Sequence, residues 1–214
     1  MAICGKSLTD PTFKLVTTLA IDTSTPQGSV AILTDRKLIF SELIQAGRSH
    51  SSQLFACLER ALVIAPSIDQ IAVGLGPGSY AGVRIAISAA IGFGIATGAK
   101  LLGLASIVAL DEGDYISLGD ARRGSFYFAE VRGGECLVGP MLLSAEELCE
   151  KLAESSGLPV YASEILPDFP QVEIRYPSAE RLARFAEIGR SVYSREDLEP
   201  IYLRDPHITQ PKPR

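Results

Sequence analysis

A carboxylate followed by two hydroxyls is the first group of side chains that could do chemistry. Asp22 ends an apolar, threonine-rich run and is followed by Thr23 and Ser24. A phosphate or magnesium site uses oxygen-bearing residues of this kind at the end of a strand. An aspartate that only hydrogen-bonds its own turn produces the same pattern. The sequence leaves both interpretations open.

A glycine-rich turn is the second candidate. Gly76 and Gly78 flank Pro77 between an expected strand and an expected helix, where free backbone N–H groups and the helix dipole favour an anion. A permissive dinucleotide fingerprint fits here, but the acidic residue that should follow about 20 residues later is absent, which argues against a nicotinamide cofactor. The same residues also suit a tight turn that binds nothing. The two segments together give a vestigial phosphate site as a hypothesis, made of Asp22, Thr23, Ser24, Gly76 and Gly78.

Other catalytic parts are scarce. The chain has two histidines, His50 and His207, which do not have the spacing of a zinc-binding helix, and neither a G-x-S-x-G nor a Walker motif occurs. We therefore expect no catalytic residue and no metal site. Asp120 with Arg122 and Arg123 is a similar candidate for a phosphate or magnesium site, and an exposed salt bridge within a turn is the alternative interpretation.

Composition describes a globular protein. The chain has 214 residues, 47% hydrophobic and 21% charged, and a net charge of −5, which opposes binding of nucleic acid by this chain alone. Residues 1–13 lack the features of a secretory signal, so we expect a cytoplasmic protein. The longest uncharged stretch, 85–99, is shorter than the ~20 residues of a membrane span, so we expect none.

Two similar passes of strands and helices must position these residues. The first pass is predicted to contain strands at 14–21, 29–33, 38–43, 71–75 and 101–104 and helices at 50–64 and 79–97. The second is predicted to contain strands at 115–118, 125–131, 135–143, 160–162 and 172–175 and helices at 144–154 and 178–193. Each pass opens with a strand, an aspartate-led turn and a hairpin, which indicates a weak internal duplication.

The duplication favours an α/β protein with two ribonuclease-H-like lobes, the second reduced. A single doubly wound sheet could give the same order of elements. The two-lobe interpretation divides the chain into a lead-in at 1–13, a first lobe at 14–110, a reduced second lobe at 111–199 and a tail at 200–214, which we expect to run over the surface or fray.

The helix at 79–97 has no clean polar face, because small and large apolar residues occur on every side and Arg84 is its only charge. A chain of this size has little material to cover both sides of such a helix, so a partner protein or a second copy is expected to cover one side, although burial within this chain alone is the alternative. The residues predicted to bind the partner come from this helix and its neighbour: His50, Leu54, Leu58, Tyr80, Gly82, Val83, Ala86, Ala89, Ala90 and Phe93.

The motifs taken together resemble one protein family. They run in the family's order over nearly the whole chain: L-A-I-D-T-S-T-P at 19–26, R-S-H-S at 48–51, G-P-G-S-Y-A-G-V-R-I at 76–85, D-A-R-R-G at 120–124 and P-I-Y-L-R at 200–204. This set is similar to the bacterial TsaB (YeaZ) family. The G-P-G-S block is shared with its catalytic paralogue TsaD, whereas the short length, the D-A-R block and the Y-L-R ending match TsaB.

The resemblance implies an actin-like ATPase-domain (ASKHA) fold and a part in forming N6-threonylcarbamoyladenosine at the adenosine next to the anticodon of tRNA. In that family TsaB is a non-catalytic scaffold that pairs with TsaD, and the TsaE ATPase joins them. It implies a homodimer when the chain is alone, tRNA contact only through the complex and no membrane. Within that complex we expect the Arg122–Arg123 turn to add one or two salt-dependent contacts to tRNA. No cofactor is required, and weak ATP or ADP binding is compatible with the family mainly in complex with TsaD.

Two points stand beside the resemblance. Ala81 occupies a position where the family usually has threonine, which weakens the case for phosphate at this turn. The glycoprotease-like label given to such sequences gains no support from these residues. The rival interpretation is an ASKHA-type enzyme, a small-molecule kinase or ATP hydrolase that uses the candidate phosphate site.

Overall fold

The computed structural model describes residues 15–45, 50–155, 157–189 and 198–204. Its first lobe is a five-stranded sheet in the order β3-β2-β1-β4-β5, in which β4 and β5 run parallel to β1 and the first three strands form an antiparallel meander. The elements of this lobe are β1 (Thr17–Asp22), β2 (Gln27–Thr34), β3 (Lys37–Gln45), α1 (His50–Ile64), β4 (Gln70–Gly74), α2 (Tyr80–Thr97) and β5 (Lys100–Leu104).

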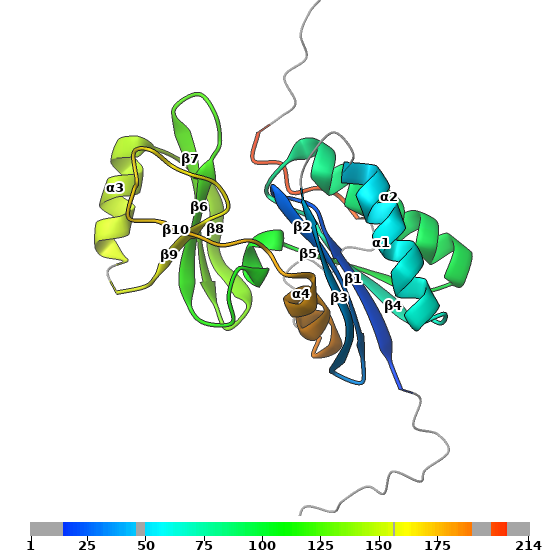
Figure 1. Cartoon of the computed structure of the whole chain (residues 1–214). Helices are drawn as coiled ribbons and strands as arrows, with labels where there is room; N and C mark the ends of the chain where they lie inside the picture. Colours follow the sequence, from blue (N-terminus) through cyan, green and yellow to red (C-terminus); the bar gives the residue numbers. More distant parts are fainter. Residues whose placement is uncertain (1–14, 46–49, 156, 190–197, 205–214) are drawn as a thin grey trace, which may run out of the picture.

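The helices α1 and α2 lie side by side on one face of this sheet (Figure 1). Ser79 caps α2, because its side chain accepts a hydrogen bond from the N–H of Gly82. Gly98 ends the helix in the left-handed conformation, and its N–H donates to the carbonyl of Gly94. The predicted boundaries of both helices are confirmed to within one residue.

The second lobe repeats the plan of the first. A short 3-10 helix, η1 (Ser106–Ala109), leads into a second five-stranded sheet in the order β10-β9-β6-β7-β8. Its elements are β6 (Tyr115–Asp120), β7 (Ser125–Arg132), β8 (Glu135–Ser144), α3 (Ala145–Glu154), β9 (Val160–Ala162) and β10 (Glu173–Ile174). Written in the opposite direction, the second order is β8-β7-β6-β9-β10, which matches β3-β2-β1-β4-β5 with β6 in the place of β1. The predicted duplication is therefore confirmed, and the single doubly wound sheet is wrong.

The last helix crosses back to the first lobe. The segment predicted as a helix at 178–193 forms α4 (Ala179–Glu187), which packs against β1 and β2 on the face opposite α1 and α2. The N–H of Ser178 donates to the carbonyl of Ala109, and the Arg181 guanidinium donates to the carbonyls of Ala109 and Leu110. The first sheet ends with β5 and the second begins with β6, so the boundary between them lies near Leu110. The helix α4 was expected in the second lobe, but it belongs to the core between the lobes.

Part of the tail is also fixed. The N–H of Ile201 donates to the carbonyl of Leu75 at 2.8 Å, and Leu198 and Ile201 pack against the core under α1 and α2. Residues 200–204 of the expected tail are half-buried or exposed and so run along the surface, but the bond of Ile201 to Leu75 holds them in place, so this part is not frayed. Residues 205–214 and the lead-in at 1–13 lie outside the described part of the chain.

Within the described residues, α2 is the one helix long and apolar enough to cross a membrane by length and composition. This differs from the expectation of no such segment, which counted only the uncharged residues. Its buried side chains pack against the sheet of the first lobe, and the core helix of a folded domain passes the same test.

Candidate functional site

Asp22 sits in a closed environment at the carboxyl end of β1. It is fully buried, and its Oδ1 accepts hydrogen bonds from the N–H of Ser24 at 2.9 Å and the Ser24 hydroxyl at 2.7 Å. Its Oδ2 is buried and has no hydrogen-bond partner among the described residues. Burial raises the pKa of Asp22 and outweighs the nearby Ser106 and Ser24 groups, which lower it. The carboxyl group accepts its hydrogen bonds from Ser24 of its own turn and does not face an open site.

The start of α2 is pressed against this turn. A Cβ atom at Gly82 would lie 1.9 Å from the carbonyl oxygen of Thr23, and one at Gly78 would lie 2.2 Å from that of Ser24. The Thr23 hydroxyl donates to the carbonyl of Gly82 at 2.7 Å, and the N–H of Ser79 donates to the carbonyl of Ser24 at 2.6 Å. The glycines are therefore needed for a close approach of two backbones.

These contacts test whether the candidate phosphate site fits a nucleotide. Asp22, Thr23 and Gly76 are buried and do not line the cleft described below, whereas Ser24 and Gly78 reach its wall. The space that a phosphate would need between the turn and the helix is filled by the chain's own backbone. The five residues do come together as predicted, but their arrangement does not fit a bound phosphate.

An open cleft of about 1050 Å³ lies between the two lobes. Its walls come from four places: the β1–β2 turn, the start of α2, the β6–β7 turn with the segment after β9, and the tail. The lining residues are Ser24, Thr25, Pro26, Pro77, Gly78, Ser79, Tyr80, Ala81, Asp120, Ala121, Arg122, Arg123, Tyr127, Ser163, Glu164, Ile201, Tyr202, Leu203 and Arg204. Within the described ranges no three histidine, cysteine, aspartate or glutamate side chains are grouped to hold a metal.

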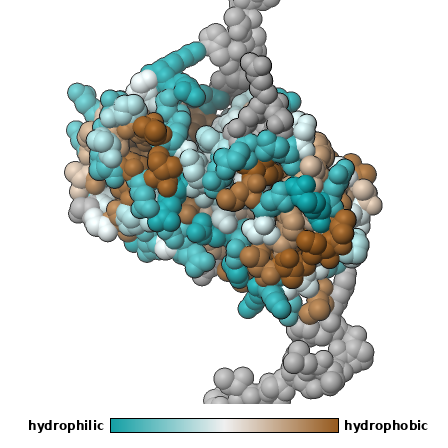
Figure 2. Space-filling model, viewed as in Figure 1, coloured by the Kyte–Doolittle hydropathy of each residue, from teal (hydrophilic) through white to brown (hydrophobic). Residues whose placement is uncertain are grey.

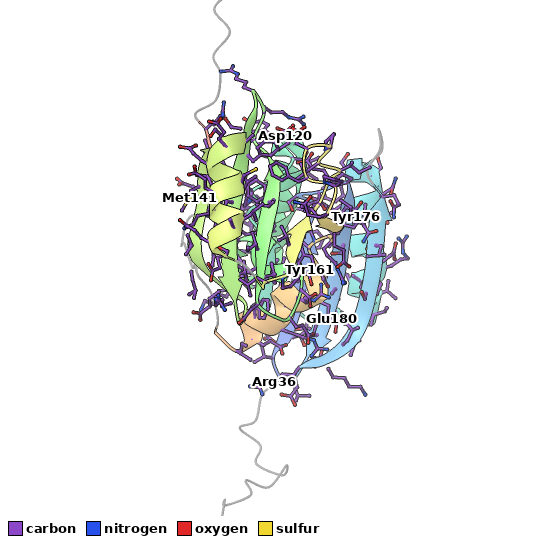
Figure 3. The ribbon with its side chains drawn as sticks, turned by 90° about the vertical axis from the view of Figure 1, so that its left-hand side faces the viewer. Arg36, Asp120, Met141, Tyr161, Tyr176 and Glu180 are labelled. Atoms are coloured by element: carbon purple, nitrogen blue, oxygen red, sulfur yellow. The ribbon has the colours of Figure 1, made fainter. Side chains whose placement is uncertain are left out.

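The β6–β7 turn is open to this cleft. Asp120 ends β6, and its carboxylate accepts from the N–H of Arg122 at 2.6 Å and pairs with the Arg122 guanidinium at 3.0 Å. Glu164, which follows β9, accepts a hydrogen bond from the N–H of Asp120 at 2.9 Å. Figure 3 shows Asp120 at one end of the molecule, far from Arg36 at the other. The exposed turn salt bridge that the sequence allowed is present.

The tail adds an aromatic wall that the sequence did not reveal. Tyr202 stacks on Tyr80 with ring centroids 5.4 Å apart, and the Arg84 guanidinium lies 5.0 Å from the centroid of the Tyr80 ring. The P-I-Y-L-R ending was visible as a motif, but no periodicity connects residue 202 with residue 80. Only the return of the tail to Leu75 brings them together.

Seven of the ten residues predicted to bind a partner are buried inside the chain's own first lobe, so the prediction is wrong for these seven as surface contacts. The sheet covers the most apolar side of both helices, so the side chains on that side are not available to a partner. The buried residues of the predicted set are Leu54, Leu58, Gly82, Val83, Ala86, Ala89 and Ala90. Tyr80 is exposed, Phe93 is half-buried, and the side chain of His50 lies outside the described residues.

A different set of apolar side chains faces outward from these two helices. Phe55 and Val63 of α1 are 50% and 83% exposed, and Ile91 and Ile95 of α2 are 39% and 81% exposed. We call these four residues the outer helix face. Figure 2 shows hydrophobic residues gathered on the side of the molecule where α1 lies. Exposed apolar side chains that cluster in this way mark interaction surfaces.

Known proteins share the sequence and the fold. The family model described as TsaD, tRNA N6-adenosine threonylcarbamoyltransferase, matches residues 44–197. An uncharacterised protein of Mycobacterium tuberculosis is 30% identical over 203 residues, which cover 90% of this chain and 94% of that protein. The Escherichia coli tRNA threonylcarbamoyladenosine biosynthesis protein TsaB is 27% identical over 220 residues, 87% of this chain and 94% of that protein.

Solved structures agree. YeaZ from Pseudomonas aeruginosa is 26% identical, with a TM-score of 0.69, over 88% of this chain and 100% of that chain. A second structure from that organism, described as similar to peptidase YeaZ, is 27% identical with a TM-score of 0.70 and the same coverage. A family model over more than half of the sequence and near full-length relatives show that the chain belongs to the TsaB (YeaZ) family, with its TsaD-type domain and α/β actin-like ASKHA fold.

Proposed function

We propose that this chain acts in the biosynthesis of N6-threonylcarbamoyladenosine in tRNA as a non-catalytic scaffold subunit that pairs with TsaD in the cytoplasm, with TsaE joining the pair. Its relatives from Escherichia coli and Haemophilus influenzae carry the name of this pathway. The observation that carries the proposal is the outer helix face. Large apolar side chains are left in water there, although the same two helices bury other apolar side chains against the sheet.

Small residues next to the outer helix face support a close contact with another protein. Ser88 and Gly92 are exposed on α2, and a Cβ atom at Gly92 would meet nothing within 4 Å. Short side chains let a second helix approach the backbone, while the flanking Ile91 and Ile95 supply apolar area. We propose that TsaD covers this face in the complex and that a second copy covers it when the chain is alone.

The closed turn supports a role without catalysis. The Oδ1 atom of Asp22 binds its own turn, and the backbone of α2 fills the place that a phosphate would need. We propose that the chain requires no cofactor, and that any weak ATP or ADP binding depends on TsaD. The rival function, an ASKHA-type kinase or ATP hydrolase, is supported by one observation, the open cleft between the lobes. Phosphate release from ATP by the purified chain that disappears in Asp22→Ala would favour the rival.

The pairing is tested with a charge on the outer helix face. Ile95→Glu should weaken binding to TsaD at least tenfold, because a carboxylate would be desolvated in an apolar contact. Ile95 is 81% exposed, so the unfolding free energy should change by less than about 0.5 kcal/mol. Ile165→Glu is the matched control, since Ile165 is 83% exposed on the second lobe. Titration calorimetry with TsaD measures both variants, and equal affinities for wild type and Ile95→Glu would contradict the proposed contact surface.

A further inference from the structure

Cations and stacked aromatic rings gather at the mouth of the interlobe cleft. Arg122 and Arg123 project from the β6–β7 turn, and Arg204 comes from the tail on the facing wall. Arg84 lies against the stacked tyrosines of α2 and the tail. We call this set the arginine–tyrosine rim: Tyr80, Arg84, Arg122, Arg123, Tyr202 and Arg204.

The rim is locally basic on a chain whose net charge is −5. Within the described residues, Arg123 and Arg204 are exposed and form no ion pair. Arg122 pairs with Asp120, but its side chain remains 80% exposed. The other carboxylate of the cleft, Glu164, is already an acceptor for the backbone N–H of Asp120. Two guanidinium groups of the rim, those of Arg123 and Arg204, therefore remain available to an anion.

The tyrosines offer a second kind of contact. Tyr80 and Tyr202 are 53% and 46% exposed although they stack on each other, so part of the ring surface faces solvent beside the arginines. Guanidinium forks match phosphate oxygens, and aromatic rings stack on nucleobases whatever the sequence. A protein partner would also use arginines and tyrosines, so binding of TsaD to this rim is one outcome of the test below.

We propose that the arginine–tyrosine rim binds a single-stranded segment of RNA, with phosphates on Arg123 and Arg204 and a base against the tyrosine pair. This inference rests on the proposed function, since tRNA is the substrate of that pathway and its anticodon loop is single-stranded. It differs from the expectation that the chain meets tRNA only through its partner. Tyr80 and Arg84 lie on the same helix as Ile91 and Ile95, whereas Arg123, Tyr202 and Arg204, which carry the proposed RNA contacts, line the cleft.

The test measures binding of a fluorescein-labelled anticodon stem-loop RNA to the full chain by fluorescence anisotropy at several salt concentrations. Arg123→Glu with Arg204→Glu should weaken binding at least tenfold and reduce the slope of log affinity against log salt by about 0.7 for each phosphate that the variant no longer binds. Tyr202→Ala should weaken binding several-fold, and Tyr202→Phe should not, because phenylalanine keeps the ring. Arg36→Glu is the matched control, since Arg36 lies at the opposite end of the molecule from Asp120 (Figure 3).

Each outcome decides the proposal. It is overturned if the double variant binds the RNA as tightly as wild type, or if Arg36→Glu weakens binding equally. It is also overturned if the double variant loses affinity for TsaD and keeps affinity for RNA, because the rim is then a protein contact. Calorimetry with TsaD on the same preparations separates the two proposals: RNA binding that depends on the rim in a chain that never binds TsaD would contradict only the scaffold function.

Discussion

The two lobes have the same strand order, but the turn after the first strand is covered in one lobe and open in the other. In the first lobe the β1–β2 turn is covered by the start of α2, and Asp22 is fully buried. In the second lobe the β6–β7 turn faces the cleft, and the Asp120 side chain is 32% exposed. An aspartate at the same place in the fold is a structural group in one lobe and a surface group in the other.

The difference follows from one missing element. The first lobe has an 18-residue helix, α2, between β4 and β5. In the second lobe the corresponding segment between β9 and β10, residues 163–172, contains Pro167 and Pro170 and forms only bends and turns. No helix of that segment presses on the second turn, so its charged side chains stay in solvent. A duplicated plan thus gives a tightly packed turn in one lobe and a turn open to the cleft in the other.

The largest expected effect breaks the closed turn. Gly82→Ala should lower the free energy of unfolding by about 3 kcal/mol, because the new methyl group would lie 1.9 Å from the carbonyl oxygen of Thr23 and must push two backbones apart. At Gly92 on the same helix a new methyl group would meet nothing within 4 Å, so Gly92→Ala should raise the free energy of unfolding by up to about 1 kcal/mol. Urea denaturation measures both, and a neutral Gly82→Ala would show that the turn and α2 are not tightly packed.

A smaller effect reports the burial of Asp22. Its pKa is raised by burial, so between the ordinary value of 3.8 and the folded value the folded protein binds more protons than the unfolded one, and stability falls as pH rises. Asp22→Asn keeps an acceptor for Ser24 and cannot ionise. The variant should gain stability over wild type as pH rises through this window, by about 1.4 kcal/mol for each unit of pKa shift.

The check is urea denaturation of both proteins from pH 4 to pH 8. Other titrating groups are shared and cancel in the difference between the two unfolding free energies. A difference that stays constant over this range would mean that Asp22 is ionised in the folded protein throughout, and the closed description of the first turn would be wrong.

Local patterns predicted most of the fold. Alternation and turn residues located the strands of both meanders, and the Ser144 and Glu147 capping box fixed the start of α3. The sequence could not predict on which sheet α4 packs, because its apolar face, which includes Leu182 and Phe185, would suit either sheet. Tertiary contacts place it on the first: Ser178 and Arg181 bond to the end of η1, and the N–H of Ala179 donates to the Ser29 hydroxyl of β2.

The candidate site was harder to predict. The sequence indicated that Asp22 and Gly78 lie close together, but it could not show that backbone atoms fill the space between them. The partner surface was assigned to residues such as Ala86 because α2 is apolar on every side, and such a helix gives no preferred face. The side that the sheet covers is set by tertiary contacts, so the exposed Ile95 was missed. The tail stack of Tyr202 on the start of α2 joins residues that no local pattern relates.

The smallest expected effect belongs to the open turn. Gly124 has φ of +69°, and a Cβ atom there would meet nothing within 4 Å. Gly124→Ala should therefore lower the unfolding free energy by about 1 kcal/mol, through backbone conformation alone and with no packing cost. Gly124→Asn should lose less, because asparagine tolerates the left-handed region. A loss at Gly124 as large as that at Gly82 in the same urea experiment would mean that the β6–β7 turn is also covered, and the contrast between the two lobes would not hold.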